Sequence, residues 1–121
     1  MNPDTRACIA YIACRLISNR TANAVYDYSG SKYHSIDGTI QANNVDVYDY
    51  DRGCHFGGSG NGGTFDIFDY GGSHHVELKI SGRNFEGFDY GASCHFSGDV
   101  NGTDISLYDY GSANYFSYAI S

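Results

Sequence analysis

Tyr48-Asp49-Tyr50 is one of five copies of an aromatic–Asp–Tyr tripeptide in this chain. The other copies are Tyr26-Asp27-Tyr28, Phe68-Asp69-Tyr70, Phe88-Asp89-Tyr90 and Tyr108-Asp109-Tyr110. The last four copies stand 20 residues apart, and the first interval is 22 residues. A fixed period of this length is typical of repeat proteins, in which every repeat adds one structural unit to a shared core. The tripeptide therefore predicts a repetitive fold.

Apolar residues and glycines recur at fixed places before each tripeptide. Counted back from its first aromatic residue, the positions 12, 10 and 8 residues earlier are apolar, aromatic or Gly, as in Phe96, Gly98 and Val100. The positions three and one residues earlier follow the same rule, as in Ile105 and Leu107. A period of two indicates strands that bury one face, so each repeat is predicted to contain two strands joined by short turns.

The two strands of one repeat are expected to share an interior. In each repeat a Gly on one strand is matched by a branched residue at the facing position of the other. The matched pairs are Gly38 with Val47, Gly58 with Ile67, Leu78 with Gly87, and Gly98 with Leu107. Because protein interiors pack to nearly constant density, volume lost at one position must be refilled opposite.

Two topologies fit these patterns. In a β-solenoid, equivalent strands stack at about 4.8 Å, whereas in an antiparallel meander the strands pair in chain order. The solenoid is favoured because only there do equivalent side chains stack, which would explain five nearly identical tripeptides. We therefore predict an all-β fold, a short two-sheet β-solenoid of about five 20-residue coils over residues 24–121. Residues 1–23 are predicted to form an N-terminal helix and a linker.

The N-terminal segment lacks the repeat and has helical signals instead. Asn2 is expected to cap a helix that begins at Pro3 and extends to Ser18, before Asn19 ends it. Its apolar residues recur at helical spacing. Because repeat arrays need protected ends, this helix is predicted to cap or cover the repeats.

The ten aromatic side chains of the tripeptides are predicted to point outward and to form a binding or assembly surface. They form two columns: Tyr26, Tyr48, Phe68, Phe88 and Tyr108, and Tyr28, Tyr50, Tyr70, Tyr90 and Tyr110. Ten rings on one face exceed the apolar patch that a monomer usually exposes. The helix, a second copy of the chain or a ligand such as a glycan is expected to cover them. The outward residues of the other strand, such as Lys79 and Asp99, are interpreted as ordinary solvated surface.

The Asp of each tripeptide is predicted to point inward beside a turn. Bare carboxylates at strand spacing would repel one another. Each is therefore expected to accept backbone N–H bonds from the following turn, such as 71–73. A row of cation sites is the alternative, and it is disfavoured because each turn offers only one Asp.

Cys54, His74 and Cys94 occupy matching places in three repeats. In a solenoid they would span about 9.6 Å, whereas a zinc ion needs ligands that converge on one point. No metal site and no cofactor are therefore expected, and these three residues are the alternative metal set. The same separation disfavours a disulfide, so reduced thiols are predicted.

Composition restricts the function further. The net charge of −7 argues against nucleic-acid binding, which needs a basic surface. No apolar run has the length of a membrane span, and the start lacks a secretory signal pattern, so a cytoplasmic location is expected. No nucleophile, base and orienting group are recognisable together, so the protein is not expected to be an enzyme.

The run from Phe96 to Ile105 alternates Gly and small aliphatic residues, and residues 34–47 are similar. Over residues 34–121 the chain resembles the windings of bactofilin-type β-solenoids, although the aromatic tripeptide and the N-terminal helix do not look like that family. The resemblance implies a nucleotide-free cytoskeletal polymer built by end-to-end stacking. It implies no binding residues.

The predicted function is structural: a self-assembling scaffold or filament subunit whose partner is a second copy of itself. The segment 115–121 ends the chain without Pro or charge, and an open strand edge of this kind pairs readily with another chain. The aromatic columns would provide a second contact. The alternative is a carbohydrate- or ligand-binding module whose aromatic face stacks on sugar rings.

Overall fold

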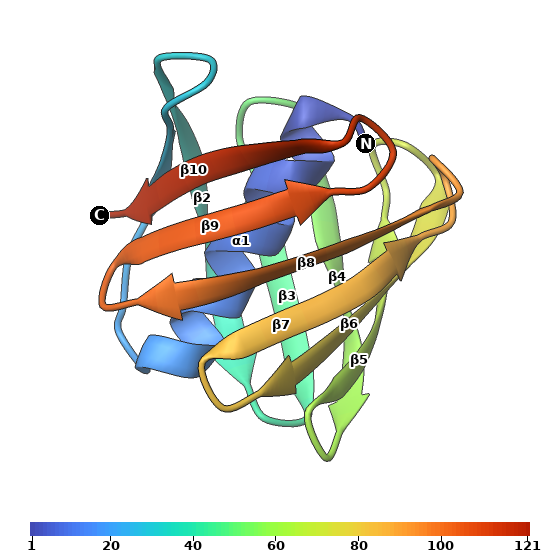
Figure 1. Cartoon of the computed structure of the whole chain (residues 1–121). Helices are drawn as coiled ribbons and strands as arrows, with labels where there is room; N and C mark the ends of the chain where they lie inside the picture. Colours follow the sequence, from blue (N-terminus) through green and yellow to red (C-terminus); the bar gives the residue numbers. More distant parts are fainter.

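The computed structural model describes all 121 residues. One helix, α1 (Pro3–Ser18), is followed by ten strands that close into an antiparallel barrel (Figure 1). The strands are β1 (Ala24–Asp27), β2 (Lys32–Gln41), β3 (Asn44–Asp49), β4 (Cys54–Asn61), β5 (Thr64–Asp69), β6 (His74–Ser81), β7 (Asn84–Asp89), β8 (Cys94–Asn101), β9 (Asp104–Asp109) and β10 (Asn114–Ile120). From β2 to β10 each strand pairs with the next one in the chain, and β1 closes the ring between β2 and β10.

The predicted two-sheet solenoid is wrong. Each 20-residue repeat is a pair of antiparallel strands, so equivalent residues of successive repeats are separated by an intervening strand and do not stack. The loops explain this outcome, because Gly62, Gly82 and Gly102 have φ values of 61°, 61° and 64° and each begins a two-residue loop. Such loops join antiparallel neighbours, whereas parallel strands need a connection of a dozen or more residues. The resemblance to bactofilin-type solenoids is overturned by the same finding.

The matching of Gly with branched residues is confirmed. All four predicted pairs are direct partners across neighbouring strands. A Cβ atom on Gly98 would overlap the carbonyl oxygen of Ser106 and the ring of Phe85. A Cβ atom on Gly87 would likewise overlap the carbonyl oxygen of Glu77 and the ring of Phe96. The glycines therefore allow large rings and neighbouring backbone to approach closely inside the barrel.

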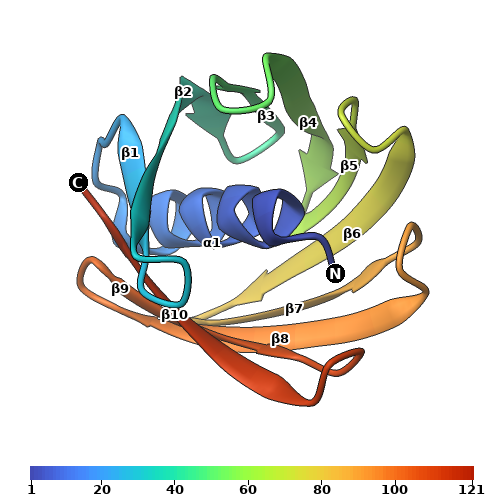
Figure 2. The ribbon, with the colours of Figure 1, turned by 90° about the horizontal axis from the view of Figure 1, so that it is seen from above.

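Helix α1 lies inside the barrel, surrounded by strands (Figure 2). Every residue from Thr5 to Cys14 is buried, so the helix has no solvent-exposed face over this stretch. The small side chains of Ala7, Ala10 and Ala13 are fully buried and keep the helix slim enough for this interior. Its predicted bounds are confirmed, and the Asn2 side chain accepts the Asp4 N–H at 2.8 Å. The predicted role as a cap or outer cover is wrong, because the helix forms the centre of the core.

The five tripeptide aspartates are buried and line the inside of the barrel at the end where α1 begins; we call them the Asp ring. The ring comprises Asp27, Asp49, Asp69, Asp89 and Asp109, each at most 4% exposed. One oxygen of each carboxylate accepts the backbone N–H groups two and three residues later. The predicted capping of the following turns is therefore confirmed.

Three members of the ring, Asp49, Asp69 and Asp109, also bind an arginine or the N-terminal segment. Arg52 bridges two members of the ring, with its Nε 2.7 Å from Asp49 and its Nη1 2.9 Å from Asp69. The Thr5 hydroxyl donates to Asp69 at 2.6 Å, and the Met1 amine lies 3.2 Å from Asp109. Burial alone would raise the pKa of Asp69, but the hydrogen bonds from Thr5 and Arg52 outweigh it and lower that pKa below its usual 3.8. The Asp ring thus holds the positive end of α1 inside the barrel.

Candidate functional site: an aromatic groove on the barrel exterior

The outer surface at the Asp-ring end of the barrel carries five clusters of three rings, which together we call the aromatic belt. In each cluster the first tripeptide ring packs edge-on against the third, with centroids 4.7–4.9 Å apart. It also packs edge-on against a ring of the next strand, at 4.6–5.0 Å. These additional rings belong to Tyr33, His55, His75, His95 and Tyr115. The tripeptide rings point outward as expected, but they encircle the barrel and do not form columns on one face.

The third ring of each tripeptide is 56–60% exposed. The first ring is partly buried beneath its neighbours. Because α1 fills the barrel interior, the helix is ruled out as one of the three covers considered for these rings.

The tyrosine at the third position of the tripeptide can reach the preceding strand. The polar side chain that its hydroxyl contacts there differs between repeats. The Tyr50 hydroxyl donates to Asp37 Oδ1 at 3.1 Å, and this hydrogen bond raises the Tyr50 pKa above its usual 10. The Tyr110 hydroxyl instead lies 3.4 Å from the Ser97 hydroxyl. The repeats therefore share an aromatic frame but differ in the polar group beneath it.

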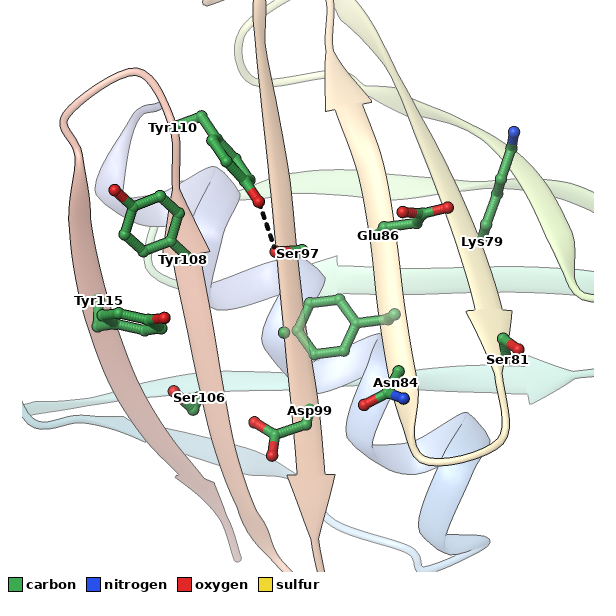
Figure 3. Close-up of a pocket in the computed structure, with 12 residues that line it drawn as sticks. Lys79, Ser81, Asn84, Glu86, Ser97, Asp99, Ser106, Tyr108, Tyr110 and Tyr115 are labelled. Carbon is green, nitrogen blue, oxygen red and sulfur yellow. Dashed lines mark hydrogen bonds between the residues drawn. The ribbon is translucent and has the colours of Figure 1, made fainter.

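A groove with a volume of about 900 Å³ lies on the outside of β6 to β10. Its aromatic side is formed by Tyr108 of β9, by Tyr110 directly after β9, and by Tyr115 of β10 (Figure 3). Several of its lining residues are small, among them Ser97, Gly98 and Ser106. The lining residues are Lys79, Ser81, Asn84, Phe85, Glu86, Ser97, Gly98, Asp99, Ser106, Tyr108, Tyr110 and Tyr115.

The polar side of the groove combines charges of both signs. Glu86 and Lys79 project from β7 and β6, and Asp99 projects from β8 between them and the tyrosines (Figure 3). Tyr115 is 73% exposed, the highest value among the large hydrophobic side chains. A flat exposed ring beside converging hydrogen-bonding groups is typical of small-molecule binding sites.

The structure brings only two of the ten predicted surface aromatics, Tyr108 and Tyr110, into this groove. Smaller grooves contain Tyr28 and Tyr70. The sequence interpretation missed Tyr115, Glu86, Asn84 and the role of Asp99 and Lys79. Their convergence depends on the order of the strands, although the position of Tyr115 in the repeat would have placed it beside Tyr108.

Cys54, His74 and Cys94 face the Asp ring and not a common metal centre. His74 Nε2 lies 3.5 Å from Asp69 and 3.7 Å from Asp89, and Cys94 Sγ lies 3.7 Å from Asp109. They lie on alternate strands and do not form a group of converging ligand atoms. No disulfide joins the four cysteines in this structure.

Comparisons with protein-family models, with curated proteins and with solved structures found no match. Helix α1 is too short to cross a membrane.

Proposed function

We propose that the protein is a carbohydrate-binding module and that oligosaccharides bind in the groove on β6 to β10. The observation that carries this proposal is the placement of the exposed Tyr115 ring beside a groove whose polar side holds Asp99 and Glu86. The barrel interior offers no comparable space, since α1 occupies it.

The chemistry of a sugar ring fits both sides of this groove. A pyranose presents an apolar C–H face, which can stack on a tyrosine ring, and a rim of hydroxyls, which can donate to carboxylates. The Asn84 amide and the Lys79 ammonium provide donors for hydroxyl and ring oxygens. The chain has no Trp, and the exposed stacking rings of the groove are tyrosines.

The test is a screen of the labelled full-length chain against immobilised oligosaccharides, followed by calorimetric titration with the strongest hit. We expect binding to change the intrinsic tyrosine fluorescence, because Tyr115 and Tyr110 line the groove. Replacing Tyr115→Ala should weaken the affinity at least about fivefold, the loss expected for a buried aromatic contact.

Tyr33→Ala is the matched control. Tyr33 is 63% exposed and packs edge-on against Tyr26 at 4.7 Å, as Tyr115 packs against Tyr108 at 4.6 Å, but it lies outside the groove. Its replacement should leave the affinity unchanged. The proposal is overturned when no oligosaccharide binds in the titration, or when both variants weaken binding equally.

Self-association through the aromatic belt is a second candidate. The observation that favours it is that third-position tyrosines, 56–60% exposed, are distributed around the whole barrel. The route through an open solenoid end is excluded, because β10 pairs with both β9 and β1. Light scattering across a wide concentration range tests this candidate. A rising mass that falls when Tyr50 and Tyr70 are replaced by Ser supports it, and a constant monomer mass contradicts it.

A further inference from the structure

The first repeat departs from the others by two residues, and this departure places a histidine inside the barrel. Strand β2 pairs with β1 through residues 32–35 and with β3 through residues 36–41. In the equivalent strand β4, most residues pair on both sides: residues 54–59 pair with β3 and residues 56–61 pair with β5. An insertion of two residues preserves the alternation of faces, so His34 points inward. Counted back from the next tripeptide, it holds the place that Cys54, His74 and Cys94 hold in later repeats.

His34 is 1% exposed, yet neither of its ring nitrogens makes a hydrogen bond. A buried polar group without a partner is costly and calls for an explanation. Nδ1 lies 3.1 Å from Asp51 Oδ2 and 3.6 Å from Asp4 Oδ1, without hydrogen-bond geometry to either. Asp51 is itself unusual, because the equivalent positions 71, 91 and 111 are all Gly.

These three residues form the only group in the chain whose potential ligand atoms all lie within 4.8 Å of one another. For metal–ligand bonds of 2.0–2.2 Å, tetrahedral ligands are separated by roughly 3.3 Å. The two separations at Nδ1, 3.1 Å and 3.6 Å, lie on either side of that value. We propose that His34, Asp4 and Asp51 bind a divalent transition-metal ion such as Zn²⁺.

The surroundings suit this assignment. His34 Nε2 faces Asp27 Oδ2 at 3.8 Å, on the side where metal-binding histidines usually have a carboxylate that orients the ring. Asp4 and Asp51 side chains are 29% and 27% exposed, which leaves an entry path and room for water as a further ligand. One imidazole with two carboxylates matches Zn²⁺ better than Ca²⁺ or Mg²⁺, which prefer oxygen ligands alone.

Lys32 is the group that would compete with the metal. Its Nζ lies 3.4 Å from Asp51 Oδ2, and its side chain is 53% exposed, so it can move into solvent when the ion binds. Lys32→Gln should therefore raise the Zn²⁺ affinity about two- to fivefold, the effect of removing one exposed charge.

The test is calorimetric titration of the metal-free full-length chain with ZnCl₂, accompanied by absorption spectroscopy with Co²⁺. We expect one saturable site per chain. His34→Gln and the more exposed Asp51→Asn should each weaken it at least about tenfold, since even the loss of a residue that only orients a ligand has that effect. His55→Gln is the matched control, because His55 is exposed, lies 3.3 Å from Asp46 and has no second carboxylate.

Three outcomes would overturn the proposal. The first is that the folded wild-type chain shows no saturable Zn²⁺ binding. The second is that Asp51→Asn, shown by circular dichroism to be folded, binds as tightly as wild type. The third is a thiolate-to-cobalt charge-transfer band, which would show that cysteines hold the metal. None of these outcomes bears on the groove at β6 to β10, so the carbohydrate proposal is tested separately.

Discussion

Leu78 in β6 lies directly opposite Gly87 in β7, the reverse of the arrangement in the other matched pairs of the barrel. In those pairs the Gly is on the even-numbered strand and the branched residue on the odd-numbered one, as in Gly58 with Ile67. The total side-chain volume of the pair is thus conserved, although the large side chain comes from the other strand. This relationship shows that the two strands of a repeat fill one space between the sheet and α1.

Exchanging the two residues should restore stability that each single replacement loses. Leu78→Gly is expected to cost about 3–5 kcal/mol through the cavity it leaves. Gly87→Leu places atoms against the Glu77 carbonyl and the Phe96 ring. The double variant should be more stable than the sum of the single effects by at least about 1 kcal/mol, as measured by urea denaturation. The stability losses of Leu78→Gly and of Val25→Ala, which lies on the opposite side of the barrel, should be additive.

The Asp ring should make the fold sensitive to acid. The pKa of Asp69 and that of Asp109 are both lowered below 3.8, because bonds from Arg52, Thr5 and the N-terminal amine outweigh burial. Such groups contribute stability above their unfolded pKa and lose it as the pH falls toward the folded pKa. Urea midpoints measured between roughly pH 5 and pH 2.5 should therefore fall steadily.

Asp69→Asn should reproduce part of this effect at neutral pH. Removing one partner of a buried ion pair is expected to cost about 3 kcal/mol, because Arg52 then keeps only Asp49. Asp66→Asn, an exposed position on the same strand, should change stability by less than about 0.5 kcal/mol. Equal effects of the two replacements would contradict the structural role of the ring.

Ionisation of Tyr118 should also lower the stability of the fold, but at alkaline pH. Burial raises its pKa from 10 to about 12, and the hydrogen bond from Arg6 at 3.4 Å only partly offsets this. The stability is present below pH 10 and is lost as the pH rises toward 12, because only the unfolded chain then releases the proton. Tyr118→Phe should remove about 2 kcal/mol of that pH dependence.

The period of the repeats, the two strands in each and the Gly-to-branched matching could be predicted because they depend on alternation along the chain. The closure of the strands into a barrel could not be predicted from the tripeptide, because its rings would face outward in a solenoid as well as in a barrel. The dipeptides Asn61-Gly62 and Asn101-Gly102 held the missing information, because Asn-Gly is a strong signal for a tight hairpin.

The buried position of α1 also has a signal in the sequence. Residues 7–14 contain no charged side chain, and a helix that is apolar on every side is buried on every side. The candidate sites were harder to predict, because Asp99 and Tyr115 meet only through strand order. His34, Asp4 and Asp51 likewise meet only because α1 enters the barrel beside β2.

Thiol labelling should report directly whether α1 stays inside the barrel. Cys8 is fully buried in the helix, and burial raises its pKa, so both access and thiolate formation are suppressed. Cys54 lies at the rim and is partly exposed. With iodoacetamide and peptide mass spectrometry, Cys54 should be modified first, while Cys8 should react only through opening of the barrel. The Cys8 rate should therefore rise with urea in parallel with global unfolding. Similar rates for the two thiols without denaturant would show that the helix leaves the barrel while the strands remain folded.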